Sequence, residues 1–355
     1  MADISNSKMQ ILKSKIALVT DPFNVIADTQ MPFLAGAIDP LKVQQQFIQH
    51  LPPAINIAQL RAIRVIRHKP GKRCLIEYDL EIENPAASQG FTLIGKARAK
   101  GTDIKSCHVQ QALWSTGFAA NSDDSVSVPE PMGVIPAFQM WLQRKVSGVI
   151  ATQLLPKPGG NGLAKRIAEA AYKLHQAGIP PRRPSHRMTC ELQILYERLP
   201  LVLQRYPQWA NRLEQILNAC SRLAAATPEP TLRGIHRDFY PDQVIVDHSR
   251  LYLLDLDLYC QGDPGLDIGN FIGHITEQSL RMLGGADALA DRENAMVERF
   301  VQLYGEAIYP AVQSYATLTL VRHIYLSTQF PERRPFTESL LELCEQRLAT
   351  AEFAK

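Results

Sequence analysis

The segment 231–271 alternates short apolar runs with seven aspartates, among them Asp238, Asp255, Asp263 and Asp267. The apolar runs 244–246 and 251–254 are each long enough for a buried strand, and the polar residues between them are typical of a turn. We therefore expect a hairpin that brings Asp238, just before the first strand, close to Asp255, at the end of the second.

Two carboxylates held side by side repel each other, so such a pair needs a compensating cation. Magnesium with phosphate groups is the commonest partner, because Mg²⁺ prefers oxygen ligands and is usually bound by one or two carboxylates together with substrate phosphates. The pattern thus predicts phosphate chemistry at the open end of the hairpin.

The letters of this segment, HRDFYPDQVIV followed by LLDLD and GDPGLDIGN, resemble the catalytic core of the aminoglycoside phosphotransferase and choline kinase group, which shares the protein-kinase fold. The resemblance implies that Asp238 is the catalytic base, that Asp255 binds Mg²⁺ and that ATP is the phosphate donor. It also places Asp263 and Asp267 in a segment that braces the catalytic loop. From the residues alone we expect both to be structural, capping a helix near Gly265.

Two residues depart from the pattern of that group. Gln243 stands where the group has an Asn that binds metal, and Arg237 stands where its small-molecule kinases usually have Gly. The extra methylene of Gln243 moves the amide oxygen by about one bond length, which octahedral Mg²⁺ tolerates poorly. We still expect Gln243 to be a metal ligand. His236 should hydrogen-bond the backbone near Asp255, and Asp257 should either assist the metal or face solvent.

A small antiparallel sheet is predicted upstream of this core. Polar and apolar residues alternate over 74–82, which indicates a strand with one solvated face, and 61–67 is its expected partner. In a kinase-like lobe the turn between them, 68–73, would cover the phosphates, so Lys72 and Arg73 are candidate nucleotide ligands. The alternative is a solvated basic turn, because the turn contains a single glycine.

A lysine in the middle of the third predicted strand, Lys96 in 91–99, calls for an explanation because the strand is otherwise so apolar. By the resemblance, Lys96 reaches the α- and β-phosphates of the nucleotide. The alternative is a lysine that protects the edge of a sheet. The helix expected at 103–114 has no Glu to pair with Lys96 and offers only Gln110 and Gln111.

These features predict an α+β, bilobal protein-kinase-like fold, with a small antiparallel-sheet N-lobe and a mostly helical C-lobe. We expect an N-terminal extension at 1–35, a nucleotide-binding N-lobe at 36–145, and a C-lobe at 146–355 that carries the catalytic loop and the substrate site. A strand at 137–142 should lead into the hinge between the lobes, where the resemblance places adenine. After Asn270 the chain should be helical to its end.

The composition sets the remaining limits. A chain of 355 residues that is 46% hydrophobic and 21% charged is long enough for two globular lobes, and its net charge of +3 predicts no general affinity for nucleic acid. The six cysteines contain no C-x-x-C pair, which favours reduced thiols and a cytoplasmic location. No apolar run approaches the roughly 20 residues of a membrane span, and the first residues lack the apolar core of a signal peptide.

The predicted function is ATP- and magnesium-dependent phosphorylation of a hydroxyl on a small molecule. The alternative is a nucleotide-binding pseudokinase with a regulatory or scaffold role, which the missing helix Glu, the single-glycine turn and Gln243 favour. Retention of both Asp238 and Asp255 argues against it. A protein-substrate kinase is a third option, weakened by the short segment that follows Asp255.

The acceptor is not specified by the sequence, although a sugar or another polyol is preferred. An aminoglycoside would favour an acidic pocket, and an amino alcohol such as choline would favour an aromatic cage. Five aromatic residues could form such a cage or could pack in the core: Tyr304, Tyr309, Tyr315, Tyr325 and Phe330. Nothing in the sequence predicts an oligomeric state.

Overall fold

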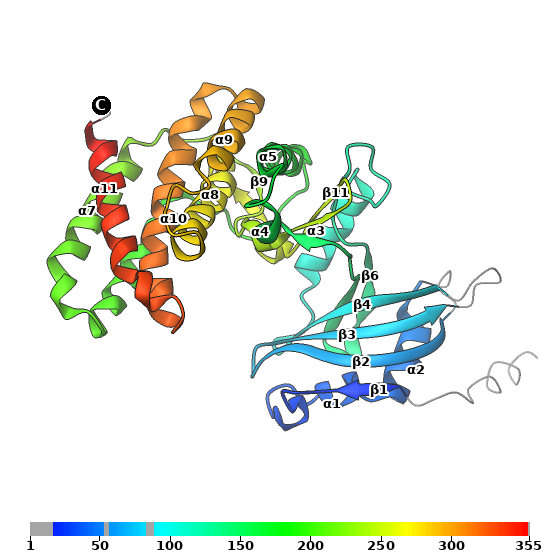
Figure 1. Cartoon of the computed structure of the whole chain (residues 1–355). Coiled ribbons are helices and arrows are strands. Elements are labelled where there is room, and N and C mark those ends of the chain that lie inside the picture. Colours follow the sequence, from blue (N-terminus) through cyan, green and yellow to red (C-terminus); the bar gives the residue numbers. More distant parts are fainter. Residues whose placement is uncertain (1–16, 53–56, 83–88, 354–355) are drawn as a thin grey trace, which may run out of the picture. The chain divides into compact units, whose positions relative to one another are not determined.

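The computed structural model describes residues 17–52, 57–82 and 89–353 of the chain (Figure 1). They form two compact units. The small unit is Met1–Trp114 with Pro129–Val146, and the large unit is Ser115–Val128 with Ser147–Lys355. The small unit thus ends one residue after the predicted end of the N-lobe, and the segment 115–128 departs from the prediction by joining the large unit.

The small unit is built on a six-stranded sheet in the order β1-β2-β3-β4-β7-β6. Its strands are β1 (Leu18–Thr20), β2 (Ile57–Lys69), β3 (Arg73–Ile82), β4 (Gln89–Arg98), β6 (Pro131–Ile135) and β7 (Met140–Arg144). All neighbouring pairs are antiparallel except β1, which runs parallel to β2 at the edge. The alternation in β3 has the expected result, since Cys74, Ile76, Tyr78 and Leu80 are all buried on one face.

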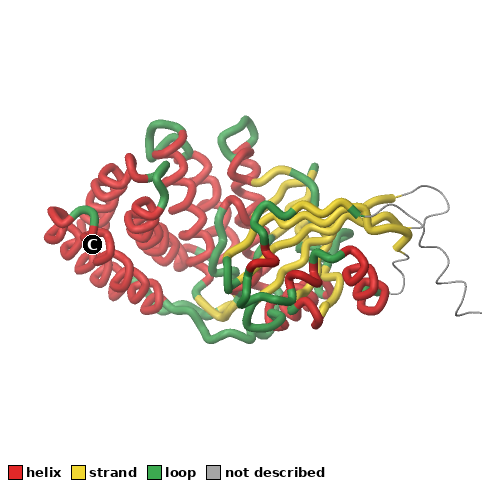
Figure 2. Tube along the Cα trace, turned by 90° about the horizontal axis from the view of Figure 1, so that it is seen from below, coloured by secondary structure: helices red, strands yellow, loops and turns green. Residues whose placement is uncertain are grey.

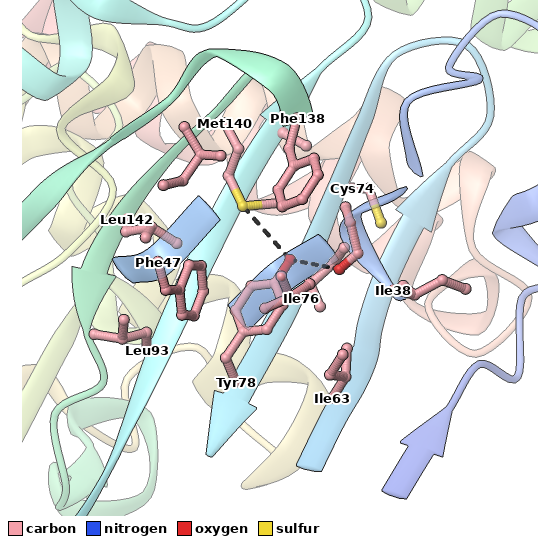
Figure 3. Packing of buried hydrophobic residues seen from close by; sticks show 14 of the residues in the cluster. Ile38, Phe47, Ile63, Cys74, Ile76, Tyr78, Leu93, Phe138, Met140 and Leu142 are labelled. Atoms are coloured by element: carbon pink, nitrogen blue, oxygen red, sulfur yellow. Dashed lines mark hydrogen bonds between the residues drawn. The ribbon is translucent and has the colours of Figure 1, made fainter. Parts of the chain in front are cut away.

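Two helices cover that buried face, α1 (Leu34–Ala37) and α2 (Pro40–His50). Asp39 caps the N-terminus of α2, because its carboxylate accepts the backbone N–H groups of Leu41 and Lys42. Figure 3 shows the Tyr78 ring at the centre of this core. Its hydroxyl donates to the Ala37 carbonyl at 2.9 Å and lies 3.6 Å from the Met140 sulfur. A buried phenol of this kind needs such partners.

Two expectations for the small unit need correction. Residues 17–35 are no separate extension in the described part of the chain, because β1 joins the sheet and Val25, Met31 and Leu34 are buried in its core. The predicted strand 137–142 begins only at Met140. Pro136–Phe138 form a 3₁₀ turn (η2) followed by Gln139 at a φ of 45°, so this stretch is the tight connection between β6 and β7.

The large unit is mostly helical (Figure 2). Its α-helices are α4 (Ala151–Leu154), α5 (Gly160–Gln176), α6 (Met188–Arg198), α7 (Ala210–Ala226), α8 (Pro264–Met282), α9 (Ala290–Tyr304), α10 (Tyr309–Gln329) and α11 (Thr337–Phe353), and a further helix, α3 (Ile104–Ser115), belongs to the small unit but for its last residue. Apolar residues of α6, α7, α10 and α11 form one buried cluster. The expected helices after Asn270 are confirmed. No helix among the described residues is long and apolar enough to cross a membrane.

Helices α8 and α10 pack unusually closely, and three glycines explain why. Gly265, Gly269 and Gly273 lie four residues apart, so they share one face of α8. A Cβ atom built on them would come within 2.9, 2.5 and 2.6 Å of side-chain atoms of α10. Because the glycines remove this obstacle, the polar side chains next to them on α8 come within hydrogen-bonding distance of α10.

The predicted hairpin is present in the large unit. It consists of β10 (Val244–Asp247) and β11 (Arg250–Leu253), paired antiparallel with Val244 opposite Leu253. Two short strands flank it, β5 (Val126–Ser127) beside β11 and β8 (Val149–Ile150) beside β10. A separate pair, β9 (Arg233–Ile235) with β12 (Cys260–Gly262), leads into and out of the hairpin region. All six cysteines are free thiols, as expected.

Candidate active site

The loop that carries Asp238 follows β9 and has no regular backbone pairing of its own. The carboxylate of Asp267, fully buried in α8, holds its first residues. It accepts the backbone N–H groups of His236 and Arg237 at 2.8 and 2.7 Å, and His175 Nε2 donates to it at 2.8 Å. Arg237 takes a φ of 71°, a left-handed conformation that these bonds stabilise. Asp267 thus braces the loop, as the resemblance implies, and does not cap the helix.

Two further hydrogen bonds hold the same loop. The buried His236 ring donates through Nε2 to the carbonyl of Leu254 at 2.7 Å, which confirms the expected bond to the backbone beside Asp255. The Asn270 side chain, also buried in α8, donates to the Phe239 carbonyl at 2.8 Å. The residues on both sides of Asp238 are therefore attached to the hairpin or to α8.

The hairpin brings Gln243 next to Asp255. The Leu254 amide donates to the Gln243 carbonyl at 2.9 Å, which continues the β10–β11 ladder by one residue. Asp255 follows directly with a φ of 50° and leaves the strand direction. Asn and Asp are the residues that enter this backbone region most readily after Gly. The predicted neighbourhood of Asp238, Gln243 and Asp255 at one end of the hairpin is thus present.

The environment of Asp238 raises the pKa of its carboxyl. Partial burial is the main cause, and the charge of Asp255 acts in the same direction. The nearby charges of His236, Arg322 and Arg237 act in the opposite direction. The repulsion between the two carboxylates, which the sequence led us to expect, is therefore present in the structure. A carboxylate with a raised pKa is a stronger base.

The residues at the hairpin end fit Mg²⁺. No group of three His, Cys, Asp or Glu side chains that could enclose a metal exists among the described residues. Mg²⁺ does not need one, because substrate phosphates and water usually complete its octahedron. Asp255 and Gln243, which the hairpin brings near each other, would supply the one or two oxygen ligands that such a site takes from protein. The mutual repulsion of Asp238 and Asp255 favours a cation there.

Two further aspartates of this segment are structural or enclosed. Asp263 caps α8 as predicted, since its Oδ1 accepts the Gly265 amide at 2.8 Å. Asp257 is only 8% exposed, so the expectation that it faces solvent is excluded. It lies in the 3₁₀ turn Leu256–Leu258 (η6) that follows Asp255.

A cavity of about 360 Å³ opens beside Asp238 within the large unit. Its walls come from the loop after Asp238, from α8 and from the end of α10 with the residues that follow it. Of the five aromatic residues considered for a cage, only Phe330 lines this cavity. Tyr304 packs instead on Tyr172 and Phe300, and Tyr315 is buried. Core packing therefore explains Tyr304 and Tyr315 better than an aromatic cage does, whereas Tyr309 is 47% exposed and does not line this cavity.

In the small unit, Lys96 lies in an interior strand. It stands opposite Leu75 of β3 and Trp141 of β7, with its ammonium 4.9 Å from the centre of a Trp141 ring. Because β4 lies between β3 and β7, the alternative of an edge-strand lysine is wrong. A lysine placed on the face of a central strand remains a candidate phosphate ligand.

No carboxylate of α3 is available to Lys96, as the sequence predicted. Gln110 is buried and donates to the Pro129 carbonyl at 2.7 Å and to Gln143 Oε1 at 3.2 Å. The buried acid on this side of the sheet is Glu77 of β3, which binds Lys145 at 2.6 Å and Arg64 at 3.1 Å. On this face of the sheet, the ion pairs of Glu77 are therefore formed with Arg64 of β2 and with Lys145, the residue after β7.

The basic turn between β2 and β3 is held by a residue from far away in the sequence. Asp28 accepts the Gly71 amide at 2.8 Å and the His68 ring at 2.9 Å, and the first of these bonds is the main reason why the pKa of Asp28 is lowered. Gly71 has a φ of 62°, a conformation that favours Gly. Lys72 is exposed and Arg73 is half-buried on this anchored turn.

Several polar residues that shape the site were not singled out from the sequence. Asn270, His274, Glu277 and Arg281 are spaced by four, three and four residues along α8, and Arg322 of α10 donates to Asn270 Oδ1 at 2.5 Å. A polar stripe at helical spacing in a largely buried helix was the available signal. Arg322, far along the chain, had no comparable signal.

The model of the phosphotransferase enzyme family matches residues 111–313, more than half of the chain. No curated protein matches this sequence. Among solved structures, a putative aminoglycoside phosphotransferase from Ralstonia eutropha is 12% identical with a TM-score of 0.58, covering 87% of this chain and 97% of its own. The GDP complex of aminoglycoside 2'-phosphotransferase-IIIa is 15% identical (TM-score 0.52; 88% and 99% covered). A choline/ethanolamine kinase family protein from Mesorhizobium loti is 14% identical (TM-score 0.50; 82% and 90% covered). The predicted α+β kinase-like fold is thereby confirmed.

Proposed function

We propose that this chain, which belongs to the phosphotransferase enzyme family, transfers the γ-phosphate of ATP to a hydroxyl of a small molecule in a magnesium-dependent reaction. The observation that carries this proposal is the position of Asp238. It combines a raised pKa, a loop held by buried hydrogen bonds, and a place in the wall of a cavity large enough for a small molecule.

In the proposed reaction, the Asp238 carboxylate accepts the proton of the acceptor hydroxyl. The acceptor oxygen forms its bond to the γ-phosphorus while the bond from that phosphorus to the β,γ-bridging oxygen breaks, and ADP leaves. Mg²⁺, held by Asp255 and Gln243, would neutralise charge on the β- and γ-phosphates. Lys96 would bind the α- and β-phosphates, and Lys72 and Arg73 would contact the phosphates from the turn.

Binding of nucleotide tests the proposal first. Calorimetry of the purified chain with ATP and with GTP, each with and without Mg²⁺, should show binding that requires the metal. Asp255→Ala should weaken that binding, whereas Asp238→Ala should leave it nearly unchanged, because the base acts on the acceptor. Equal loss of affinity in both variants would contradict the assigned roles, and no binding at millimolar nucleotide would contradict the kinase function.

A nucleotide-binding protein without turnover is the second candidate, because no acid of α3 is present and Gln110 is engaged by Pro129 and Gln143. A screen of the protein with ATP and Mg²⁺ against hydroxyl-bearing metabolites separates the two functions. Phosphate transfer to any acceptor supports the kinase. Nucleotide binding without transfer across the screen supports the second candidate. In either case we expect a cytoplasmic protein.

A further inference from the structure

Charged side chains of both signs line the cavity beside Asp238. Two of the carboxylates are Asp238 and Asp242, the second of which accepts a hydrogen bond from the Thr152 hydroxyl. The rest of the lining carries three arginines and a single carboxylate. The arginines are Arg281 of α8, Arg322 of α10 and Arg333, which follows α10. These three arginines bear on the kind of acceptor that can bind.

One buried carboxylate, Glu277, lies next to two of these arginines. Arg281 Nε donates to Glu277 Oε1 at 2.9 Å, while Arg333 Nη1 is 4.0 Å from the same oxygen, too far for a hydrogen bond. The Glu277 side chain is 5% exposed, whereas those of Arg281 and Arg333 are 22% and 30% exposed. One negative charge therefore faces two positive charges, and guanidinium N–H groups remain for an oxyanion.

The third arginine, Arg322, is fixed in place by its own partners. It donates to Asn270 Oδ1 at 2.5 Å and to Glu191 Oε2 at 3.2 Å, and Glu191 also binds His186 at 2.6 Å. Glu191 therefore accepts hydrogen bonds from both Arg322 and His186. Arg322 also lies close enough to Asp238 to lower its pKa. This arginine is thus near Asp238 as well as in the wall of the cavity.

Two histidines pack beside the arginines without adding charge to the cavity. The His274 ring, which lines the cavity, stacks on Tyr240 at 4.6 Å, and His323 packs edge-on against His274 at 4.5 Å. Burial, together with the charges of Arg322 and Arg333, holds the pKa of both histidines well below the usual value. Both rings are therefore neutral near pH 7, so the arginines and the carboxylates supply the charge of the cavity.

We propose that the acceptor carries an oxyanion group, a carboxylate or a phosphate, in addition to the hydroxyl that is phosphorylated. The anionic group would bind Arg281 and Arg333, and the hydroxyl would reach Asp238 in the same cavity. Planar guanidinium groups bind carboxylate and phosphate in the same paired geometry. This inference rests on the proposed function, and it excludes aminoglycosides and choline as the preferred acceptors because a cation would face the arginines.

The first test compares acceptors that share a carbon skeleton and differ in one substituent. Glycerol, serinol, glycerate and glycerol 3-phosphate form one series, and glucose, glucosamine, gluconate and glucose 6-phosphate form another. With ATP and Mg²⁺, the anionic members should show a kcat/KM at least about tenfold above the neutral and cationic members. Comparison of glycerate and gluconate with glycerol 3-phosphate and glucose 6-phosphate distinguishes a carboxylate from a phosphate as the oxyanion. Transfer that favours neutral or cationic members would overturn the inference but leave the kinase function intact.

The second test needs no turnover and so stands apart from the kinase function. With Mg²⁺ and AMP-PNP present to fill the nucleotide site, inorganic phosphate and acetate are titrated against the full chain at constant ionic strength, with thermal stability as the readout. At least one anion should stabilise the protein in a saturable way. Arg333→Gln should weaken this apparent affinity about tenfold, and Arg333→Lys should restore part of it.

Arg334→Gln is the matched control, because Arg334 is the next residue but donates to the Thr328 carbonyl and does not line the cavity. The control should bind the anions like the wild type. If neither anion binds, or if Arg333→Gln binds as well as Arg334→Gln, the oxyanion site is contradicted. If the anions bind as expected but no nucleotide does, the kinase function fails and the anion site stands.

Discussion

The two units present their candidate site residues in different ways. In the large unit, Asp238 lies on an irregular loop whose shape depends on buried side chains, chiefly Asp267 and Asn270. In the small unit, Lys96 lies on a strand whose backbone is held by its two neighbours in the sheet. A loop without a hydrogen-bond ladder needs side chains to specify it, whereas a strand does not. Substitutions should therefore change the shape of the site in the large unit and only its affinity in the small unit.

The largest effect is expected at the proposed base, Asp238. Asp238→Asn removes the proton acceptor without changing the size of the side chain, so kcat should fall by about 10³-fold while nucleotide affinity stays nearly constant. Initial rates and calorimetry measure the two quantities. Asp242→Asn is the control, because Asp242 lines the same cavity and should cost far less activity. Equal losses in both variants would contradict the role of Asp238.

The next largest effect is expected at Asp267, and it tests whether the shape of the loop around Asp238 depends on buried side chains. Asp267→Asn replaces an acceptor of three N–H groups by an amide that cannot accept them all, so the free energy of unfolding should fall by on the order of 3 kcal/mol. Urea denaturation measures this. Asp263→Asn is the control, because Asn is also a good helix cap and stability should change little. A fully stable Asp267→Asn protein would show that the loop is held by other contacts.

Gln243→Asn tests the proposed metal ligand that departs from the family pattern. If Gln243 binds Mg²⁺ with the geometry of its own backbone, the shorter side chain misplaces the oxygen by about 1 Å and the rate should fall on the order of 100-fold. An increased rate would instead indicate a decayed site. An unchanged rate, in an active wild type, would mean that Gln243 does not contact the metal and that one ion held by Asp255 suffices.

Glu293, a carboxyl of the large unit outside the loop that carries Asp238, allows the effect of burial on a pKa to be measured apart from any effect on catalysis. Burial raises the pKa of Glu293 to about 7 from 4.5, although Thr276 donates a hydrogen bond to it. The native state then binds the proton more tightly than the unfolded state does. Ionisation of Glu293 therefore lowers the free energy of unfolding. This cost grows as the pH rises from 4.5 to 7 and is complete above that range. Glu293→Gln should raise the free energy of unfolding by about 3 kcal/mol at pH 8 and leave it nearly unchanged near pH 4.5. Denaturation at both pH values checks this, and the same change at both would contradict the raised pKa.

The smallest effect is expected in the small unit. Lys96→Met keeps most of the apolar stem beside Trp141 and removes the charge, so the dissociation constant of ATP should rise about tenfold with little change in thermal stability. Lys100→Met, at an exposed position after β4, is the matched control and should bind ATP normally. A large loss of stability in Lys96→Met would contradict the expectation that substitutions at the site in the small unit change only affinity.

The sequence by itself determined the features that depend on neighbouring residues. Alternation over 74–82 predicted β3, and apolar runs around a polar turn predicted the β10–β11 hairpin and so the proximity of Asp238 and Asp255. The spacing of Asp263 from Gly265 predicted the helix cap. Such features succeed because backbone periodicity and capping are local. The same reason explains why the predicted strand 137–142 was partly wrong. Its apolar pattern is that of a strand, but Pro136 and the turn at Gln139 move the start of the strand to Met140.

Only the tertiary structure decided which distant side chains meet. The close packing of α8 on α10 brings Arg322 to Asn270, 52 residues earlier in the chain, and places Arg281 and Arg333 around Glu277. Asp28 likewise reaches Gly71 across the small unit. These contacts depend on how closely two elements approach and on which faces they turn to each other. A pattern read along one element carries no such information, so the charge of the cavity beside Asp238 could not be predicted from the sequence.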